Sequence, residues 1–109
     1  MRSEIRHMGD LPMLSFAGEL DFAACPSVDS AIEAAAAEGD GHLIIDLDEV
    51  AYMDSPIFGC LIKAHHRLGA NHLAIVCPQP ELMKLVKATM LDTELCFVND
   101  VKEARDCFM

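Results

Sequence analysis

Two short apolar segments with an amphipathic stretch between them constrain the fold of this chain most. Residues 42–47 and 72–77 are almost entirely apolar, and residues 56–68 between them carry apolar side chains at helical spacing. Short apolar runs of this kind are typical of strands that are buried on both faces. Two such strands joined by a helix form a parallel pair with a right-handed crossover. We therefore expect an α/β fold.

The remaining segments extend this alternation in both directions. Gly9-Asp10 is a turn signal between two short strand-like runs, which predicts an N-terminal hairpin. The predicted strands are 3–8, 11–17, 42–47, 72–77 and 94–98; after the third of them we expect a turn at 48–49 and a strand extension at 50–53. The predicted helices are 26–38, 56–68, 81–90 and a last helix that ends at 108. Asp100 or Asn99 caps this last helix. Together they predict a mixed sheet of about five strands covered by about four helices.

Size and charge narrow the classes of function. The chain has 109 residues, which predicts a single domain over 1–109. Its formal net charge is −10, so it should repel nucleic acid and anionic lipid, and a basic protein surface is a suitable partner. No apolar run approaches the ~20 residues that a membrane span needs. We expect a cytoplasmic protein that does not insert into membranes, and both a monomer and a weak dimer remain open.

Cysteine and histidine side chains give no clear pattern for catalysis or metal binding. The five cysteines contain no Cys-x-x-Cys pair and mostly have apolar neighbours, so we interpret them as small buried hydrophobic residues. His65 and His66 lie too far along the predicted helix from Ser55 to deprotonate it. We therefore expect no catalytic residue, no metal site and no cofactor, and we do not expect an enzyme.

The segment around Ser55 is the strongest candidate for a functional site. Ser55 is a preferred N-cap residue and Pro56 a preferred first helical residue, which places the hydroxyl at the positive end of a helix. Such an end stabilises a phosphate or another anion. Asp21 and Asp54 follow strand-like segments, and we expect them near the hydroxyl if both strands end at the same edge of the sheet. The alternative is a plain structural cap that is never modified.

Several segments resemble STAS domains and, more narrowly, the anti-sigma factor antagonists among them. Residues 43–55 (LIIDLDEVAYMDS) resemble the family's signature, in which a buried strand leads to Asp-Ser-Ser-Gly-Leu-Gly. Residues 18–21 match the family's Gly-Glu-Leu-Asp, and residues 88–92 resemble its Thr-Gly-Leu segment, with Met90 in place of the glycine. Residues 100–108 resemble its closing helix, so the resemblance covers nearly the whole chain.

This resemblance implies a STAS-like mixed sheet with the helices mainly on one face, and it also implies a function. In the family, the unphosphorylated antagonist binds an anti-sigma factor, often a serine kinase, and so frees a sigma factor. Phosphorylation of the Asp-Ser serine abolishes the binding, and a phosphatase restores it. Ser55 corresponds to that serine. The implied partner-binding residues are Asp21, Asp54, Ser55, Pro56, Ile57, Phe58 and Gly59.

The chain departs from the family pattern directly after the serine. Where the family has Ser-Gly-Leu-Gly, this chain has Pro56-Ile57-Phe58-Gly59. Pro56 removes one N–H from the first turn of the helix, which weakens an anion site by one donor. The departure favours an alternative function, in which the protein is a standalone STAS subunit of a lipid-transporting ABC transporter and is not phosphorylated.

Overall fold

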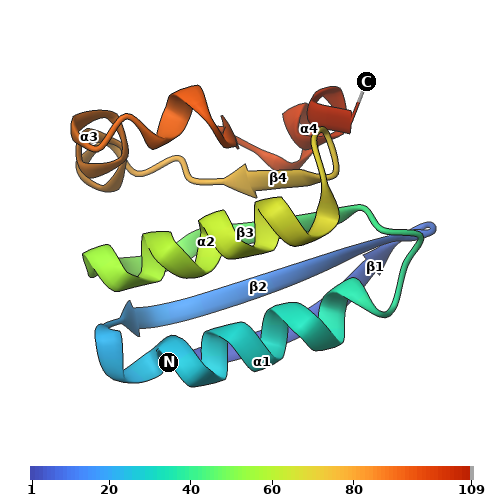
Figure 1. Ribbon diagram of the computed structural model, residues 1–109, viewed down its shortest axis with the longest axis horizontal. Helices are drawn as coiled ribbons and strands as arrows, with labels where there is room; N and C mark the ends of the chain where they lie inside the picture. Colours follow the sequence, from blue (N-terminus) through green and yellow to red (C-terminus); the bar gives the residue numbers. More distant parts are fainter. Residues whose placement is uncertain (109) are drawn as a thin grey trace.

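The N-terminal hairpin and the later strands share one five-stranded sheet (Figure 1). The computed structural model describes residues 1–108. The strands are β1 (Arg2–Met8), β2 (Leu11–Leu20), β3 (Leu43–Met53), β4 (Leu73–Val76) and β5 (Cys96–Val98), and they lie side by side in the order β1-β2-β3-β4-β5. β1 pairs with β2 antiparallel, and every later neighbour is parallel. The predicted mixed α/β sheet with an N-terminal hairpin is confirmed.

Helices connect the parallel strands. The helices are α1 (Cys25–Ala36), α2 (Ser55–Leu68), α3 (Pro80–Ala88) and α4 (Val101–Ala104), with short 3-10 turns η1 (Phe22–Ala24), η2 (Leu91–Thr93) and η3 (Arg105–Phe108). In Figure 1, α1 and α2 lie together in front of the sheet. None of the helices in residues 1–108 combines the length and apolar character that a bilayer crossing requires.

The sheet has a large core on one face and a smaller one on the other. The main core joins alternate strand residues to α1, α2 and α3, and its members include Leu14, Phe16, Ile45, Leu47, Val28, Ile32, Ile57, Leu61, Leu82 and Val86. On the opposite face, α4 and η3 cover a smaller cluster that contains Met13, Ile44, Ala74, Val76, Ala104 and Cys107. Helices therefore lie mainly on one face, as expected, and part of the other face is left open.

β3 is longer and less regular than the sequence pattern predicted. It runs without interruption from Leu43 to Met53, so the predicted turn at 48–49 is wrong, and β2 likewise continues to Leu20 and not only to residue 17. Its pairing with β2 shifts twice, and at each shift β3 carries one residue more than β2. These are β-bulges, and each one moves the next core-facing side chain by one position. The buried residues of the main core in β3 are accordingly Leu43, Ile45, Leu47, Val50 and Met53.

The side chain of Gln79 holds the bulged part of β3 in place. Its Nε2 lies within hydrogen-bond distance of three β3 carbonyl oxygens, at 2.6 Å from Leu47, 3.1 Å from Asp48 and 2.8 Å from Val50. A bulge leaves backbone groups without their regular ladder partners, and buried backbone groups need a replacement. Gln79, just before α3, supplies that replacement.

Three predicted helix ends differ from the structure, and one of them only slightly, since the helix predicted at 26–38 ends at Ala36. The helix predicted at 81–90 ends at Ala88, because Met90 has φ 59° and ψ 22°, in the left-handed region, where no α-helix can continue. The predicted cap at Asp100 is confirmed, since its carboxylate accepts the Glu103 N–H at 2.8 Å. The helix that it caps changes to a 3-10 turn after Ala104.

The interpretation of the five cysteines is wrong for two of them. Cys96 of β5 and Cys107 of η3 form a disulfide between the last strand and the segment that covers the second face. Cys25, Cys60 and Cys77 are free thiols. Burial raises the pKa of Cys60 to about 12 and that of Cys77 to about 11, so both thiols stay protonated at neutral pH and pack as small apolar side chains.

Candidate functional site at the ends of two parallel strands

The adjacent strands β2 and β3 end together, and this brings two acidic residues to one edge of the sheet. Leu20 and Met53, their last residues, are paired in register. The Asp54 N–H donates to the Leu20 carbonyl oxygen at 3.0 Å, which extends the ladder by one further bond. Asp21 and Asp54 therefore leave the sheet side by side, at the edge where parallel strands present their carboxyl ends.

The Asp54 carboxylate connects the two segments that leave this edge. One of its oxygens, Oδ2, accepts the backbone N–H of Phe22 at 3.0 Å, and the other accepts the hydroxyl of Tyr52. The Tyr52 hydrogen bond, together with the carboxylate charge, raises the pKa of the phenol above its usual value. Asp54 thus has a structural role, because it fixes η1 against the start of α2.

Asp54, and not Ser55, is the N-cap of α2. Asp54 has extended backbone angles, φ −89° and ψ 158°, and the helix begins at Ser55 with Pro56 in its first turn. The predicted cap is therefore wrong by one residue. The physical reason is that the Asp54 backbone N–H still pairs with β2, so the chain turns helical only after it. Ser55 nevertheless lies exposed in the first turn of the helix, where free N–H groups point outward.

The predicted partner-binding residues divide between the surface and the core. Ser55, Pro56 and Gly59 are exposed on α2. Ile57 and Phe58 are 0% and 5% exposed and belong to the main core, so their side chains are not available to a partner in this structure. Helical periodicity explains the division, because residues four apart such as Ser55 and Gly59 lie on the same side of a helix.

Two exposed aromatic side chains beside Asp54 were missing from the predicted site. Phe22 is 69% and Tyr52 is 47% exposed, although large aromatic side chains are usually buried. The Asp54 carboxylate accepts the hydroxyl of Tyr52 and the backbone N–H of Phe22, whose ring makes no hydrogen bond. The sequence signal was available, since each aromatic residue lies within two positions of a candidate aspartate.

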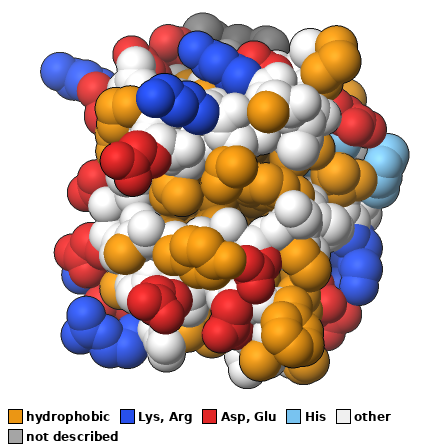
Figure 2. All heavy atoms as spheres, turned by 90° about the vertical axis from the view of Figure 1, so that its left-hand side faces the viewer, with side chains coloured by type: hydrophobic (Ala, Val, Ile, Leu, Met, Phe, Trp, Pro, Cys, Tyr) orange, Lys and Arg blue, Asp and Glu red, His pale blue; other side chains and the backbone are white. Residues whose placement is uncertain are grey.

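Figure 2 shows the end of the molecule that corresponds to the left side of Figure 1, where β2 ends and α2 begins. Hydrophobic side chains are exposed there among acidic ones. An exposed apolar area surrounded by charge is typical of a protein–protein contact. We call the following residues the Ser55 surface: Asp21, Phe22, Tyr52, Ser55, Pro56 and Gly59.

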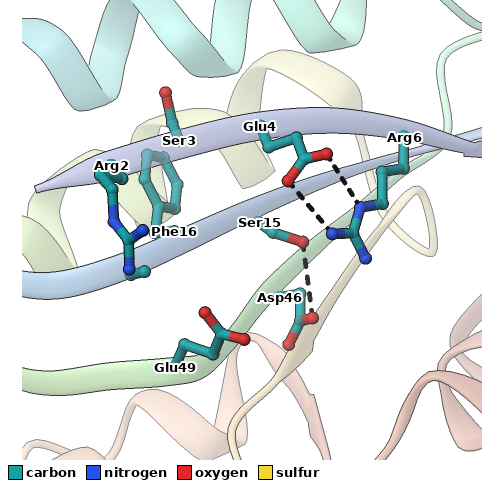
Figure 3. A pocket seen from close by; sticks show the side chains of 9 residues that line it. Arg2, Ser3, Glu4, Arg6, Ser15, Phe16, Asp46 and Glu49 are labelled. Atoms are coloured by element: carbon teal, nitrogen blue, oxygen red, sulfur yellow. Dashed lines mark hydrogen bonds and ion pairs between the residues drawn. The ribbon is translucent and has the colours of Figure 1, made fainter.

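A separate hollow of about 500 Å³ lies on the open face of the sheet, away from the helices (Figure 3). Its lining combines charged side chains of both signs with the apolar side chains of Phe16 and Ala17. Arg6 donates to the Glu4 carboxylate at 3.1 and 3.2 Å, and the Ser15 hydroxyl donates to Asp46 at 3.5 Å. Neither Asp21 nor Ser55 lines it, so this hollow is distinct from the Ser55 surface.

Within residues 1–108, no group of three or more His, Cys, Asp or Glu side chains is arranged to hold a metal ion.

Solved structures with a similar fold include anti-sigma factor antagonists. An anti-sigma factor antagonist from Mycobacterium paratuberculosis has a similar structure, with a TM-score of 0.88 at 22% identity over 98% of this chain and 92% of that one. An anti-sigma-factor antagonist (STAS) domain protein from Planctomyces limnophilus gives a TM-score of 0.82 at 18% identity, over 97% of both chains. The phosphorylated form of the Bacillus cell fate determinant SpoIIAA gives 0.65 at 19% identity, over 96% of this chain and 97% of that one.

The family itself follows from the sequence. The STAS domain model matches residues 2–104, and the chain therefore belongs to the STAS domain family. A comparison with curated proteins finds no significant match.

Proposed function

We propose that this protein is an anti-sigma factor antagonist that works by partner switching. In its unmodified form it binds an anti-sigma factor of the serine-kinase type through the Ser55 surface, and phosphorylation of Ser55 releases that partner. A phosphatase then restores binding. The observation that carries the proposal is the position of Ser55, which is exposed in the first turn of α2 and directly follows Asp54 in a STAS domain.

Charge is the physical basis of the proposed switch. A phosphate on Ser55 adds about −1.5 to −2 charges at neutral pH. It would lie at a surface that already carries Asp21 and Asp54, on a chain with a net charge of −10. An acidic partner group that tolerates the serine hydroxyl would be repelled by the phosphate. The proposal includes no chemistry by this chain, which acts by binding alone in the cytoplasm.

The test begins with the partner. The wild-type protein is used to capture binding proteins from its native cells, and mass spectrometry identifies them. Recovery of a kinase-like anti-sigma factor supports the proposal. Calorimetry then compares the wild type with Ser55→Glu and with Ser55→Ala as the matched control. We expect Ser55→Glu to cost about 2 kcal/mol of binding free energy and Ser55→Ala to cost little. Equal affinities for all three proteins would refute the switch.

Pro56 favours a second candidate function. Because a proline in the first turn has no N–H, this helix offers a phosphate one donor fewer than a helix without it. A STAS subunit of a lipid-transporting ABC transporter has no need of that donor, since it is not phosphorylated. Capture of a transporter ATPase in place of a kinase would support this alternative, and in that case a kinase fraction should not label Ser55.

A further inference from the structure

The outer edge of β1 is open to another strand. β1 lies at the end of the sheet order and pairs only with β2, and within residues 1–108 no element pairs with its other edge. Five of its seven residues are exposed, and Ile5 is only partly buried at the margin of the main core. An open edge of this kind is a template for strand pairing with another chain.

The charges of β1 are complementary to a second copy of the same strand. Arg2, Glu4 and Arg6 project to one face, where all three line the open hollow (Figure 3). The side chains of Glu4 and Arg6 are 61% and 60% exposed. Their order along the strand is positive, negative, positive, so an antiparallel copy can place opposite charges against each other.

Only one of the neighbouring antiparallel registers satisfies these charges. When Ile5 faces Ile5 of the second copy, Glu4 faces Arg6 and Arg6 faces Glu4. A shift by two residues in one direction places Glu4 opposite Glu4, and a shift in the other direction places Arg6 opposite Arg6. Opposite charges directly across a strand pair stabilise it, whereas like charges destabilise it.

The same register also gives the greatest overlap of the two strands. Ile5 is the midpoint of β1, which spans Arg2–Met8, so all seven residues find a partner when the two-fold axis passes through Ile5. The two isoleucines would then cover each other at the margins of the two cores. Strand length and charge order, two independent properties, therefore select one arrangement.

We propose that β1 is a self-association edge, through which two copies of this chain form an antiparallel β1–β1 pair centred on Ile5. The product is a continuous ten-stranded sheet with two-fold symmetry and with the main helix layers on the same side. Because the two copies run in opposite directions, their Ser55 surfaces lie at opposite ends of the dimer and both stay free. The contact is a single strand pair, smaller than a standard stable interface, so the dimer is weak and depends on concentration.

Charge-swapped variants of the full chain test the register. Glu4→Arg and Arg6→Glu each place like charges across the two-fold axis, twice per dimer, and should weaken dimerisation by about tenfold or more. An equimolar mixture of the two variants restores opposite charges in the heterodimer, and the double variant Glu4→Arg/Arg6→Glu restores them in the homodimer. Sedimentation equilibrium measures association, and far-UV circular dichroism checks that each variant is folded.

The proposal predicts association for the wild type, the mixture and the double variant, and a loss of association for each single variant alone. A wild type that remains monomeric up to about 1 mM overturns it. Single variants that associate as well as the wild type also overturn it, because association would then use another surface. These outcomes do not depend on the proposed function of Ser55, since no residue of the Ser55 surface is changed.

Discussion

Gly59 offers a test in which stability and binding are expected to change in opposite directions. It lies in the interior of the 14-residue helix α2, exposed and one turn after Ser55. A Cβ atom added there meets no other atom within 4 Å, and the backbone of Gly59 does not have a positive φ. Gly59→Ala should therefore introduce neither a clash nor strain.

The expected size of the effect follows from helix propensity. Glycine in a helix interior is less favourable than alanine by about 1 kcal/mol, because it loses more backbone entropy on folding. No packing change adds to this or subtracts from it at an open position. Gly59→Ala should raise the free energy of unfolding by about 1 kcal/mol and the Tm by about 4 °C. Urea unfolding followed by circular dichroism measures the change, with an unaltered m-value.

Binding is expected to change in the other direction. Since nothing inside the molecule occupies the space over Gly59, the proposed function leaves that space to the partner, and a methyl group would obstruct its approach. A suitable control is His66→Ala in the last turn of the same helix. His66 is exposed, and its one ion pair within residues 1–108 is with Glu94, at 3.6 Å. A gain in stability with unchanged affinity would remove Gly59 from the Ser55 surface. A loss of stability would refute the helix argument itself.

Three further predictions concern single side chains. Met90 has a left-handed backbone conformation, which costs free energy for a residue with a Cβ atom and which glycine adopts freely. Met90→Gly should therefore raise the free energy of unfolding in urea by about 0.5–1 kcal/mol, and a destabilised variant would contradict this. Gln79→Leu should cost about 1–3 kcal/mol by the same assay, because the β3 carbonyls lose their donor, and an unchanged midpoint would show that water replaces it. Tyr52 is the one tyrosine in the chain, so an alkaline absorbance titration should give a pKa above 10.0, with a return toward that value in Asp54→Asn. Because folding raises the pKa of Tyr52, the stabilisation from this contact is present below pH 10 and is lost as the pH rises through the folded-state pKa. Coincident titration curves for the wild type and Asp54→Asn would refute the role of Asp54.

The sequence predicted the order of elements well, because apolar runs and helical spacing respond to burial directly. It failed within β3, where the acidic pair Asp48-Glu49 suggested a turn. The apolar positions that face the main core are two residues apart up to Leu47 and three apart from there to Met53. That change of spacing marks the bulges, and it was readable in the sequence. The bond from Gln79 to β3 was not, because it joins residues about thirty positions apart.

The candidate site was predicted by position and not by side-chain direction. Asp21, Asp54 and Ser55 lie at one edge of the sheet because β2 and β3 are parallel neighbours, as the alternation of strands and helices implied. Ile57 and Phe58 were included because they follow Ser55, yet helical spacing turns both into the core. The Cys96–Cys107 bond depends on η3 folding back onto the sheet beside β5, where it packs on β4, and no local pattern reveals this.

The double contact of the Asp54 carboxylate also limits how this position can vary. One side chain satisfies the amide of η1 and the hydroxyl of Tyr52 while its own backbone ends the sheet and starts α2. Glutamate keeps the charge but has one methylene more, and that extra length moves the acceptor away from Phe22. At this position a replacement that conserves charge does not conserve geometry, so side-chain length is under stricter constraint here than charge is.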